Sequence, residues 1–243
     1  MSRQHTHSRR QFLLTALVVP IAARAGLDAQ APSPKPMKIG IIGSGRQGGA
    51  IGLQWAKAGH EVFFSSRNPG NLKDLVAKAG PKARAGTPAE AAKFGDVILV
   101  AVPYGELPNV GRDNAALMKG KVVIDVGNPR VDRDGQVGAD ALKRGTGVAS
   151  AEHLPGVRLV RALNALSFVQ VERDAHRQGE KLGIPIAGDD KAAVDIATQL
   201  VVDAGFDPVF VGGLARAREF DAGTPVYVKG LTARQLREAL KVQ

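Results

Sequence analysis

Three glycines spaced as G-x-G-x-x-G, namely Gly43, Gly45 and Gly48, carry the clearest chemical signal in this sequence of 243 residues. They follow a β-branched run at 38–42 and precede a stretch at 46–58 whose apolar residues recur with helical spacing. In such a unit the first glycine allows a tight turn, the second lets a pyrophosphate approach the backbone, and the third lets helix and strand pack closely. Free N–H groups at the helix start bind the phosphates. The pattern predicts a dinucleotide site; a chance glycine-rich loop is the alternative.

The residues after the second strand of this unit indicate which dinucleotide is bound. Proteins selective for NAD place a carboxylate about 20 residues after the glycines, where it accepts a hydrogen bond from the ribose 2′-hydroxyl. Here the corresponding residues, 65–68, contain no carboxylate. A 2′-phosphate needs hydroxyl donors and a planar guanidinium, which Ser66 and Arg67 supply, and Lys73 adds a further positive charge. We therefore predict NADP(H); the alternative is a solvated turn whose arginine has no ligand.

Three later strands are each followed by a segment that contains polar residues. The strands are predicted at 96–102, 121–126 and 157–163, and the segments are 103–106, 127–129 and 164–167. Ligands of open α/β sheets bind at the carboxyl ends of the strands. We therefore expect these segments to border the nicotinamide half of the cofactor; a structural turn is the alternative for each.

The alternation of strands and helices predicts an α/β fold of Rossmann type, with a doubly wound, mainly parallel sheet and a small α/β C-terminal extension. Capping boxes at 87–90 and 232–235 mark two helix starts, and Asn71 is predicted to cap a short helix that ends at Gly80. Residues 130–147 contain glycines and mixed charges and are predicted to be a loop, with a short helix at 146–154. Two short strands are expected at 184–187 and 208–211, separated by a helix that begins at Asp190.

The chain divides by composition into four parts. Residues 1–31 resemble a twin-arginine export signal, because Arg9 and Arg10 precede a short apolar segment, and residues 32–36 are a proline-rich linker. A Rossmann domain is predicted at 37–163, and a part for acceptor binding and homodimer formation at 164–243. The signal predicts a periplasmic or exported protein. A basic amphipathic helix is the alternative for this segment, and a translation start at Met37 would give a cytoplasmic form.

Composition excludes several functions. Hydrophobic residues make up 44% and charged residues 23%, as in ordinary globular proteins, and no run of 18 apolar residues predicts a membrane span. The net charge of +10 favours anionic ligands, but the aromatic content of 5% argues against a nucleic-acid partner. The sequence has no cysteine, and its histidines lack metal-ligand spacing, so we expect neither a disulfide nor a metal site.

Seven motifs carry a resemblance to a known family across residues 37–243. They are IGIIGSGRQG, GHEVFFSSRN, VAVP, VVIDVGNP, LVRALNAL, IPIAGDD and GGLARAREFD. The sequence resembles the coenzyme F-420-dependent NADP oxidoreductase family, and it is similar to the reductase domain of the six-transmembrane epithelial antigen metalloreductases. At the position of Asn164 the archaeal deazaflavin enzymes carry histidine, whereas the metalloreductase-type sequences carry asparagine.

The resemblance implies roles for particular residues. Those implied to line the pyrophosphate are Ser44, Gly45, Arg46 and Gln47, and those implied to hold the 2′-phosphate are Ser66 and Arg67. Those implied to lie along the nicotinamide are Val102, Pro103, Asn128 and Ala165. Asn164 is expected to position the carboxamide or the acceptor, since a neutral amide is not a useful acid or base near pH 7; capping of the following helix is the alternative.

Three functions remain open on the sequence alone. The first is an NADP(H)-dependent oxidoreductase that transfers hydride between NADPH and a flavin-like or deazaflavin acceptor, such as coenzyme F-420. The second is a reductase of a small imine or hydroxy acid, which normally needs a longer, all-helical second domain with a catalytic lysine. The third is a non-catalytic NADP-binding or redox-sensing protein. Hydride transfer between stacked rings needs no acid or base from the protein in its main step, so the missing catalytic triad does not exclude the first.

Overall fold

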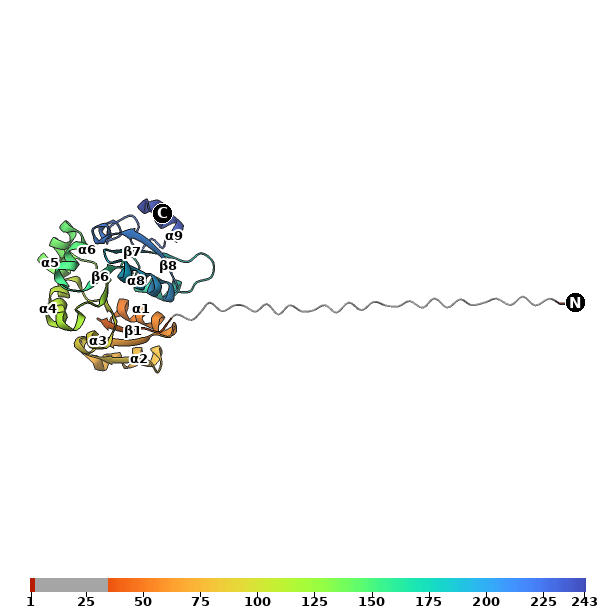
Figure 1. Cartoon of the computed structure of the whole chain (residues 1–243), viewed down its shortest axis with the longest axis horizontal. Coiled ribbons are helices and arrows are strands. Elements are labelled where there is room, and N and C mark those ends of the chain that lie inside the picture. Colours follow the sequence, from red (N-terminus) through yellow and green to blue (C-terminus); the bar gives the residue numbers. More distant parts are fainter. Residues whose placement is uncertain (3–34) are drawn as a thin grey trace. The chain divides into compact units, whose positions relative to one another are not determined.

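The computed structural model describes residues 1–2 and 35–243 of the chain. The predicted export signal, beyond its first two residues, and positions 32–34 of the predicted linker lie outside the described residues. The fold below is that of residues 35–243 (Figure 1).

Residues 35–243 fold around one eight-stranded sheet with the order β3-β2-β1-β4-β5-β6-β7-β8. The strands are β1 Lys38–Ile42, β2 Glu61–Ser65, β3 Arg84–Gly86, β4 Val97–Val100, β5 Val122–Asp125, β6 Arg158–Arg161, β7 Gly183–Gly188 and β8 Asp207–Gly212. Neighbouring strands are parallel except for β6 and β7, which pair antiparallel. This arrangement confirms the predicted Rossmann-type, mainly parallel sheet.

Helices cover both faces of the sheet. They are α1 Arg46–Lys57, α2 Lys73–Ala79, α3 Pro88–Phe94, α4 Leu107–Met118, α5 Val131–Arg144, α6 Thr146–His153, α7 Phe168–Asp174, α8 Lys191–Asp203 and α9 Ala233–Leu240. Short 3-10 turns occur at Pro69–Leu72, Tyr104–Glu106 and Leu214–Glu219. One apolar core joins the sheet to α1, α7 and α8, and another joins its opposite face to α3, α4, α5 and α6. Within the described part of the chain, no helix is both long and apolar enough to cross a membrane.

Strand residues alternate between the two cores, as the pleat of a sheet requires. Val97 and Leu99 of β4 contribute to the core under α1 and α8, whereas Ile98 and Val100 contribute to the core under α3 and α4. Both faces of these strands are therefore buried, which explains why the sequence reads as continuous apolar runs.

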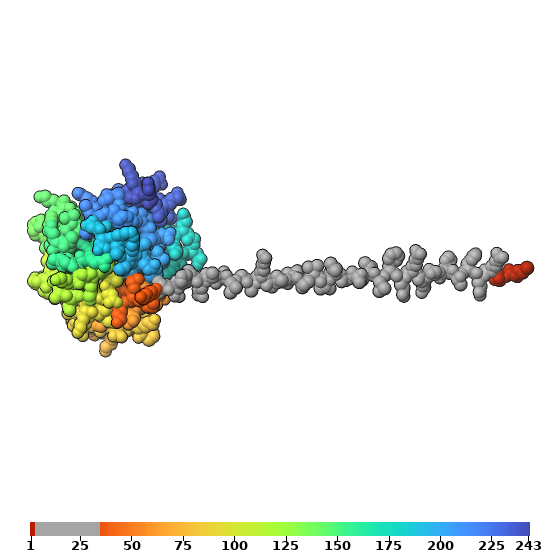
Figure 2. Space-filling model, in the orientation of Figure 1, coloured from red at the N-terminus to blue at the C-terminus, as the bar shows by residue number. Residues whose placement is uncertain are grey.

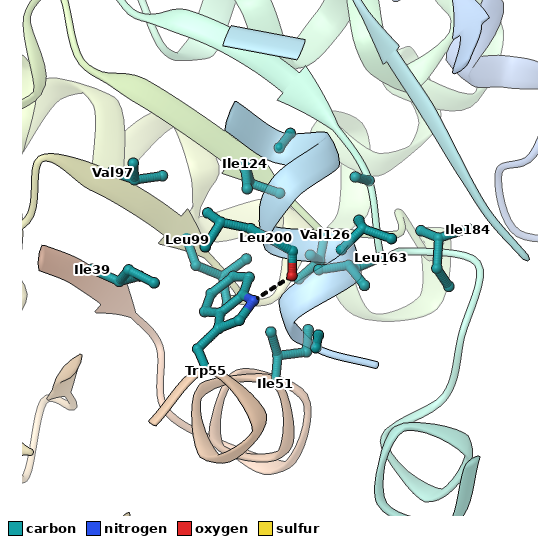
Figure 3. Packing of buried hydrophobic residues seen from close by; sticks show 14 of the residues in the cluster. Ile39, Ile51, Trp55, Val97, Leu99, Ile124, Val126, Leu163, Ile184 and Leu200 are labelled. Atoms are coloured by element: carbon teal, nitrogen blue, oxygen red, sulfur yellow. Dashed lines mark hydrogen bonds between the residues drawn. The ribbon is translucent and has the colours of Figure 1, made fainter. Parts of the chain in front are cut away.

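Trp55 connects the N-terminal and C-terminal halves of the chain inside the first core (Figure 3). Its side chain is fully buried, and its indole Nε1–H donates to the backbone oxygen of Leu200 at 2.7 Å. This hydrogen bond joins α1 to α8 across 145 residues of sequence. Figure 2 accordingly shows the orange N-terminal region bordering the cyan and blue C-terminal region in one continuous body.

Local signals located most elements correctly. Thr87 and Thr232 form the predicted capping boxes of α3 and α9, and the side chain of Asp190 caps α8 by accepting from the N–H of Ala193. The helix predicted at 146–154 is α6. The strands predicted at 184–187 and 208–211 are β7 and β8.

Two local predictions are wrong, and one strand was missed. Residues 131–144, expected to lie in a loop, form α5, whose glycines obscured the pattern; Gly135, with a φ of 55°, produces a kink inside it. Asn71 does not cap a helix: it lies inside the 3-10 turn Pro69–Leu72, and α2 begins only at Lys73. The three-residue edge strand β3 was not predicted, because its sequence, Arg-Ala-Gly, has no strand pattern.

Candidate functional site

A cleft of about 610 Å³ lies beyond the carboxyl ends of β4 and β5 and beside the start of α1. Its lining residues are Arg46, Gln47, Ala101, Val102, Pro103, Val126, Gly127, Asn128, Arg130, Arg133, Leu166, Ser167, Phe168, Ala222 and Tyr227. The cleft thus brings together five residues predicted from the sequence. These are Arg46, Gln47, Val102, Pro103 and Asn128.

The glycine turn between β1 and α1 has the geometry that a pyrophosphate requires. Gly43 has a φ of 95°, and a Cβ there would lie 2.7 Å from the oxygen of Ala101; at Gly48 it would lie 2.3 Å from the oxygen of Gly43. At Gly45 a Cβ would meet nothing within 4 Å, so this part of the turn is open to a ligand. The first turn of α1 contains no acidic residue, and its N–H groups precede the first intrahelical hydrogen bond, from Gly49 to Gly45. The turn therefore fits the diphosphate of a dinucleotide.

Ser44 is directed into the protein. Its side chain is buried, its Oγ accepts from the N–H of Ser65 at 2.9 Å, and its own N–H donates to the oxygen of Ser65 at 2.8 Å. These bonds tie the glycine turn to the end of β2. The hydroxyl expected to line the pyrophosphate thus fixes the relative position of the two segments that are predicted to bind phosphates.

The residues predicted for the 2′-phosphate lie just beyond β2. Ser66 is half-buried, its Oγ accepts from the N–H of Asn68 at 3.1 Å, and Arg67 is exposed. Lys73 is the exposed first residue of α2. Within residues 35–243, neither Arg67 nor Lys73 forms a side-chain hydrogen bond or ion pair with the protein, so both cations are available to an anion. None of the three lines the cleft, as expected for groups that would contact the opposite end of a dinucleotide.

Asn164 supports the cleft from behind. It is 1% exposed, and it exchanges two hydrogen bonds with Asn128: the Nδ2 of Asn128 donates to the oxygen of Asn164 at 2.8 Å, and the Nδ2 of Asn164 donates to Oδ1 of Asn128 at 3.3 Å. Ala165, also buried, is likewise absent from the lining. Asn164, expected to position the carboxamide or the acceptor, therefore lies behind the wall that Asn128 forms, and Ala165, expected along the nicotinamide, does not line the cleft.

The alternative role for Asn164, as a helix cap, is wrong. The N-cap of α7 is Ser167, which forms a capping box with Gln170. Asn164 instead follows Leu163, which has a φ of 62°, a strained backbone conformation for a residue with a side chain. Strain of this kind persists only where surrounding contacts hold it, and it is common at functional sites.

Gln47 holds this strained segment to α1, the helix that is predicted to bind the cofactor. Its Nε2 donates to the backbone oxygen of Leu163 at 3.2 Å and to that of Leu166 at 3.1 Å. The two carbonyls lie on either side of Asn164, so one side chain at the start of α1 fixes the loop that supports Asn128. Gln47 was predicted to contact the pyrophosphate. In the structure its side chain joins the start of α1 to the segment 163–166.

Several lining residues were not predicted from the sequence. They include Phe168, Tyr227 and Arg130. The ring centre of Phe168 lies 5.0 Å from the guanidinium of Arg46, which was predicted, and this is within cation–π range. Burial raises the pKa of Tyr227, although the neighbouring charge of Arg133 opposes the shift. Their sequence contexts offered no periodicity or spacing that marks a ligand site, because these side chains meet only in the folded chain.

Asp134 holds the two arginines that line the cleft beside Asn128. Burial acts to raise the pKa of Asp134, but hydrogen bonds from Arg133 and from the N–H of Arg130 outweigh it and lower this pKa to about 2. Arg133 also donates to the oxygen of Asn128 at 2.9 Å. The carboxylate thus remains ionised and keeps Arg133 in place against the cleft.

A buried ion network lies under the site and was missed in the sequence. Arg161, at the end of β6, is fully buried; its Nη1 donates to Oδ2 of Asp125 at 2.7 Å, and its Nη2 donates to Oδ1 of Asp221 at 3.1 Å. Asp221 also accepts from Thr146 and lies 3.5 Å from Nδ2 of Asn164. The network therefore connects β5 and β6 to the segment that carries Asn164.

Tyr104 belongs to the same network, although its segment was expected to border the nicotinamide. Its side chain is buried, and its hydroxyl lies 3.0 Å from Oγ of Ser150, which donates to Oδ2 of Asp125 at 2.7 Å. Burial raises the pKa of Tyr104 to about 12. Only Pro103 of that segment lines the cleft.

Comparison with known proteins confirms the resemblance predicted from the sequence. Residues 38–129 match the family model described as NADP oxidoreductase coenzyme F420-dependent. The chain is 28% identical over 223 residues to the F420-dependent NADP reductase of Methanothermobacter marburgensis, covering 84% of this chain and 96% of that protein. It is 30% identical over 206 residues to the metalloreductase STEAP3 of Rattus norvegicus, covering 81% of this chain but only 38% of that protein's length.

The solved structures support the fold assignment. A protein from Arthrobacter sp. FB24, provisionally named an F420-dependent NADP reductase, superposes with a TM-score of 0.65 at 22% identity, covering 85% of this chain and 96% of that one. The fold, the glycine turn and the relatives define the class of Rossmann-type, NADP-dependent oxidoreductases. Within that class, the chain resembles the coenzyme F420-dependent NADP oxidoreductase family, and the matched residues include the glycine turn, Arg67 and Asn128.

Replacing Arg161 with methionine would leave Asp125 and Asp221 buried without a counter-ion. We expect Arg161→Met to lower the free energy of unfolding by about 3 to 5 kcal/mol, as when one partner is removed from a buried ion pair. Urea denaturation followed by circular dichroism measures the change.

The matched control is Arg112→Met, because Arg112 forms an ion pair with Asp113 in which both side chains are exposed. That substitution should cost less than about 1 kcal/mol. Combining Arg161→Met with Asp125→Asn and Asp221→Asn should recover part of the loss, since no uncompensated charge remains buried. Equal destabilisation by Arg161→Met and Arg112→Met would refute the structural role of the network.

Proposed function

We propose that this protein is an NADPH-dependent reductase that passes hydride to a flat, flavin-like or deazaflavin acceptor. The observation that carries the proposal is the cleft itself, where the predicted nicotinamide wall of Val102, Pro103 and Asn128 shares one cavity with Phe168 and Tyr227. Aromatic side chains suit a flat conjugated ring. The family match, described by its coenzyme F420 dependence, supports an acceptor of this shape.

The polar groups of the cleft fit hydride transfer between two stacked rings better than the reactions of a small imine or hydroxy acid. The described residues that line it include no histidine, lysine, aspartate or glutamate. Transfer between stacked rings requires positioning and exclusion of water, whereas reduction of an imine or carbonyl also needs a proton donor at the reacting atom. The one phenol in the lining, Tyr227, has a raised pKa and faces Arg133. A lysine-dependent reductase is therefore the weaker alternative.

Each part of the chain has a separate task in this scheme. When bound, NADPH supplies the hydride. The glycine turn and Arg67 would hold the diphosphate and the 2′-phosphate, and Asn128 would orient the group that lies against it. Asn164 and Gln47 act through their neighbours: Asn164 fixes the amide of Asn128, and Gln47 fixes the loop that carries Asn164.

Removal of the Arg67 guanidinium tests the cofactor assignment. NADPH should bind the wild-type protein at least about tenfold more tightly than NADH, because one charge-assisted site contributes about 1.4 kcal/mol. Arg67→Ala should remove most of this preference and leave the NADH affinity unchanged. Fluorescence titration with both nucleotides measures it.

Lys78→Ala is the control, because Lys78 is an exposed cation on the same helix as Lys73. It should leave both affinities unchanged. If the wild-type protein bound NADPH and NADH equally, the assignment of residues 65–68 to a 2′-phosphate site would be wrong.

Truncation of Asn164 tests the positioning role. Asn164→Ala should lower turnover with a flavin or deazaflavin acceptor by about ten- to a hundredfold, and should leave NADPH affinity within about threefold, because it removes the support of Asn128 and no cofactor anchor. Steady-state kinetics and cofactor titration on the same preparation separate the two quantities.

A double-mutant cycle with Asn128→Ala sharpens this test. If Asn164 acts through Asn128, the double variant should be no slower than the worse single variant, because both remove one interaction. Additive losses would show that Asn164 contacts the reactants by another route. A lowered melting temperature with unchanged turnover would show that its role is only structural.

A twin-arginine export route is the proposal for residues 1–31, which carry Arg9 and Arg10. Because a receptor reads this motif, replacing both arginines with lysine should retain the protein in the cytoplasm. Cell fractionation with an antibody measures the change, and Arg3→Lys is the matched control. Unchanged localisation of the double variant would instead support a start at Met37.

A further inference from the structure

A second cavity lies beside the cleft and has no role in the scheme above. Its volume is about 550 Å³, and it lies between α7 and residues 228–230. Ser167 lines both cavities, and Val228 of the second directly follows Tyr227 of the first. The two cavities are therefore neighbours, separated by a ridge that Ser167 and residues 227–228 form.

The second cavity is cationic. Arg173, Arg177 and Lys229 line it, and the only acidic side chain in the described lining is Asp174. Asp174 pairs with Arg173, with distances of 2.9 Å and 2.7 Å between the guanidinium and the carboxylate. Arg177 and Lys229 form no ion pair within residues 35–243, so the cavity retains two positive charges for an anion.

The ridge between the cavities is backbone held in a strained conformation. Val228 has a φ of 50°, which is a genuine outlier for a β-branched residue. Its N–H donates to the oxygen of Ala165 at 2.9 Å, and its oxygen accepts from Nε2 of Gln170 at 3.2 Å. The strain is thus maintained by contacts with Ala165, which follows Asn164, and with Gln170 of α7.

The top of the ridge is apolar. Val228 is 38% exposed, and Val169, which also lines the second cavity, is 50% exposed. The ridge between the cleft and the cationic cavity therefore presents an apolar surface. A ligand that crosses it would place a ring on one side, an uncharged linker over the valines, and an anion on the other side.

We propose that the second cavity binds a phosphate group on the side chain of the hydride acceptor, whose ring occupies the cleft. This inference rests on the proposed function and deepens it, because it specifies the acceptor class as a flat ring with a phosphate-bearing side chain. Arg177 and Lys229 supply the charge-assisted donors that a phosphate requires. The valines contact the linker.

Flavins that differ only in the phosphate provide the test. Acceptor-dependent NADPH oxidation by the full chain is measured with FMN and with riboflavin, and with coenzyme F-420 and its chromophore lacking the phosphate-bearing tail. We expect KM to be about tenfold lower for the phosphorylated member of a pair that is reduced. Binding of FMN and riboflavin to the NADP⁺-loaded protein, followed by flavin fluorescence, should show the same ratio without turnover.

The double variant Arg177→Ala/Lys229→Ala should raise KM for the phosphorylated acceptor by about tenfold and leave KM for its partner within about twofold. The matched control is Arg112→Ala/Lys78→Ala, which removes one exposed arginine and one exposed lysine that line neither cavity. It should change neither value. Inorganic phosphate should compete with FMN and not with riboflavin.

The outcomes separate this inference from the function on which it rests. If no acceptor of either pair is reduced, the proposed function is wrong and the inference falls with it. If both members of a pair are reduced with equal KM, or the double variant raises both KM values together, the function stands and the phosphate site is wrong. Dissociation of a dimer by the double variant at unchanged KM would identify this face as an interface between copies, and would also overturn the proposal.

Discussion

The buried guanidinium of Arg161 is the interaction on which the rest of the site depends. It lies at the end of β6, where the sheet changes from parallel to antiparallel pairing, and it bridges Asp125 of β5 to Asp221. Three charges removed from water are tolerated only if every partner is present, because an unpaired buried charge costs several kcal/mol. The ion pairs therefore hold β5, β6 and the segment of Asp221 together in the arrangement that places Asn164 behind Asn128.

Hydrogen bonds from two side chains extend this constraint to α1. Trp55 joins the body of α1 to α8, and Gln47 joins its first turn to the carbonyls of Leu163 and Leu166. The helix whose N-terminus fits the diphosphate thus also fixes the loop that supports the opposite wall of the cleft. The first turn of α1 therefore contributes Arg46 and Gln47 to the cleft and also holds the segment that lies behind Asn128.

Sequence reasoning succeeded where the physical signal is local. The glycine turn, the buried strands and the capping boxes at Thr87 and Thr232 depend on neighbours within a few residues. It failed where the signal is tertiary. The apolar and cationic lining residues Phe168 and Arg133 come from segments with no shared pattern, and α5 was hidden because its buried face includes a glycine and a carboxylate. The segments that follow the strands correctly predicted the edge of the sheet at which the cleft lies. They did not predict which side chains of each segment line it.

The electrostatics of the cleft follow from this tertiary assembly. Hydride transfer adds negative charge to the acceptor, and the described lining offers arginines and amides without a carboxylate. The counter-ions of Arg130 and Arg133 are Asp132 and Asp134, neither of which lines the cleft. An acceptor in the cleft would therefore meet the positive ends of these pairs at shorter range than the negative ends. Preorganised dipoles of this kind stabilise charge as it develops and require no rearrangement during the reaction. The same arrangement disfavours a cationic imine, so the position of two carboxylates outside the cleft bears directly on which substrate the protein accepts.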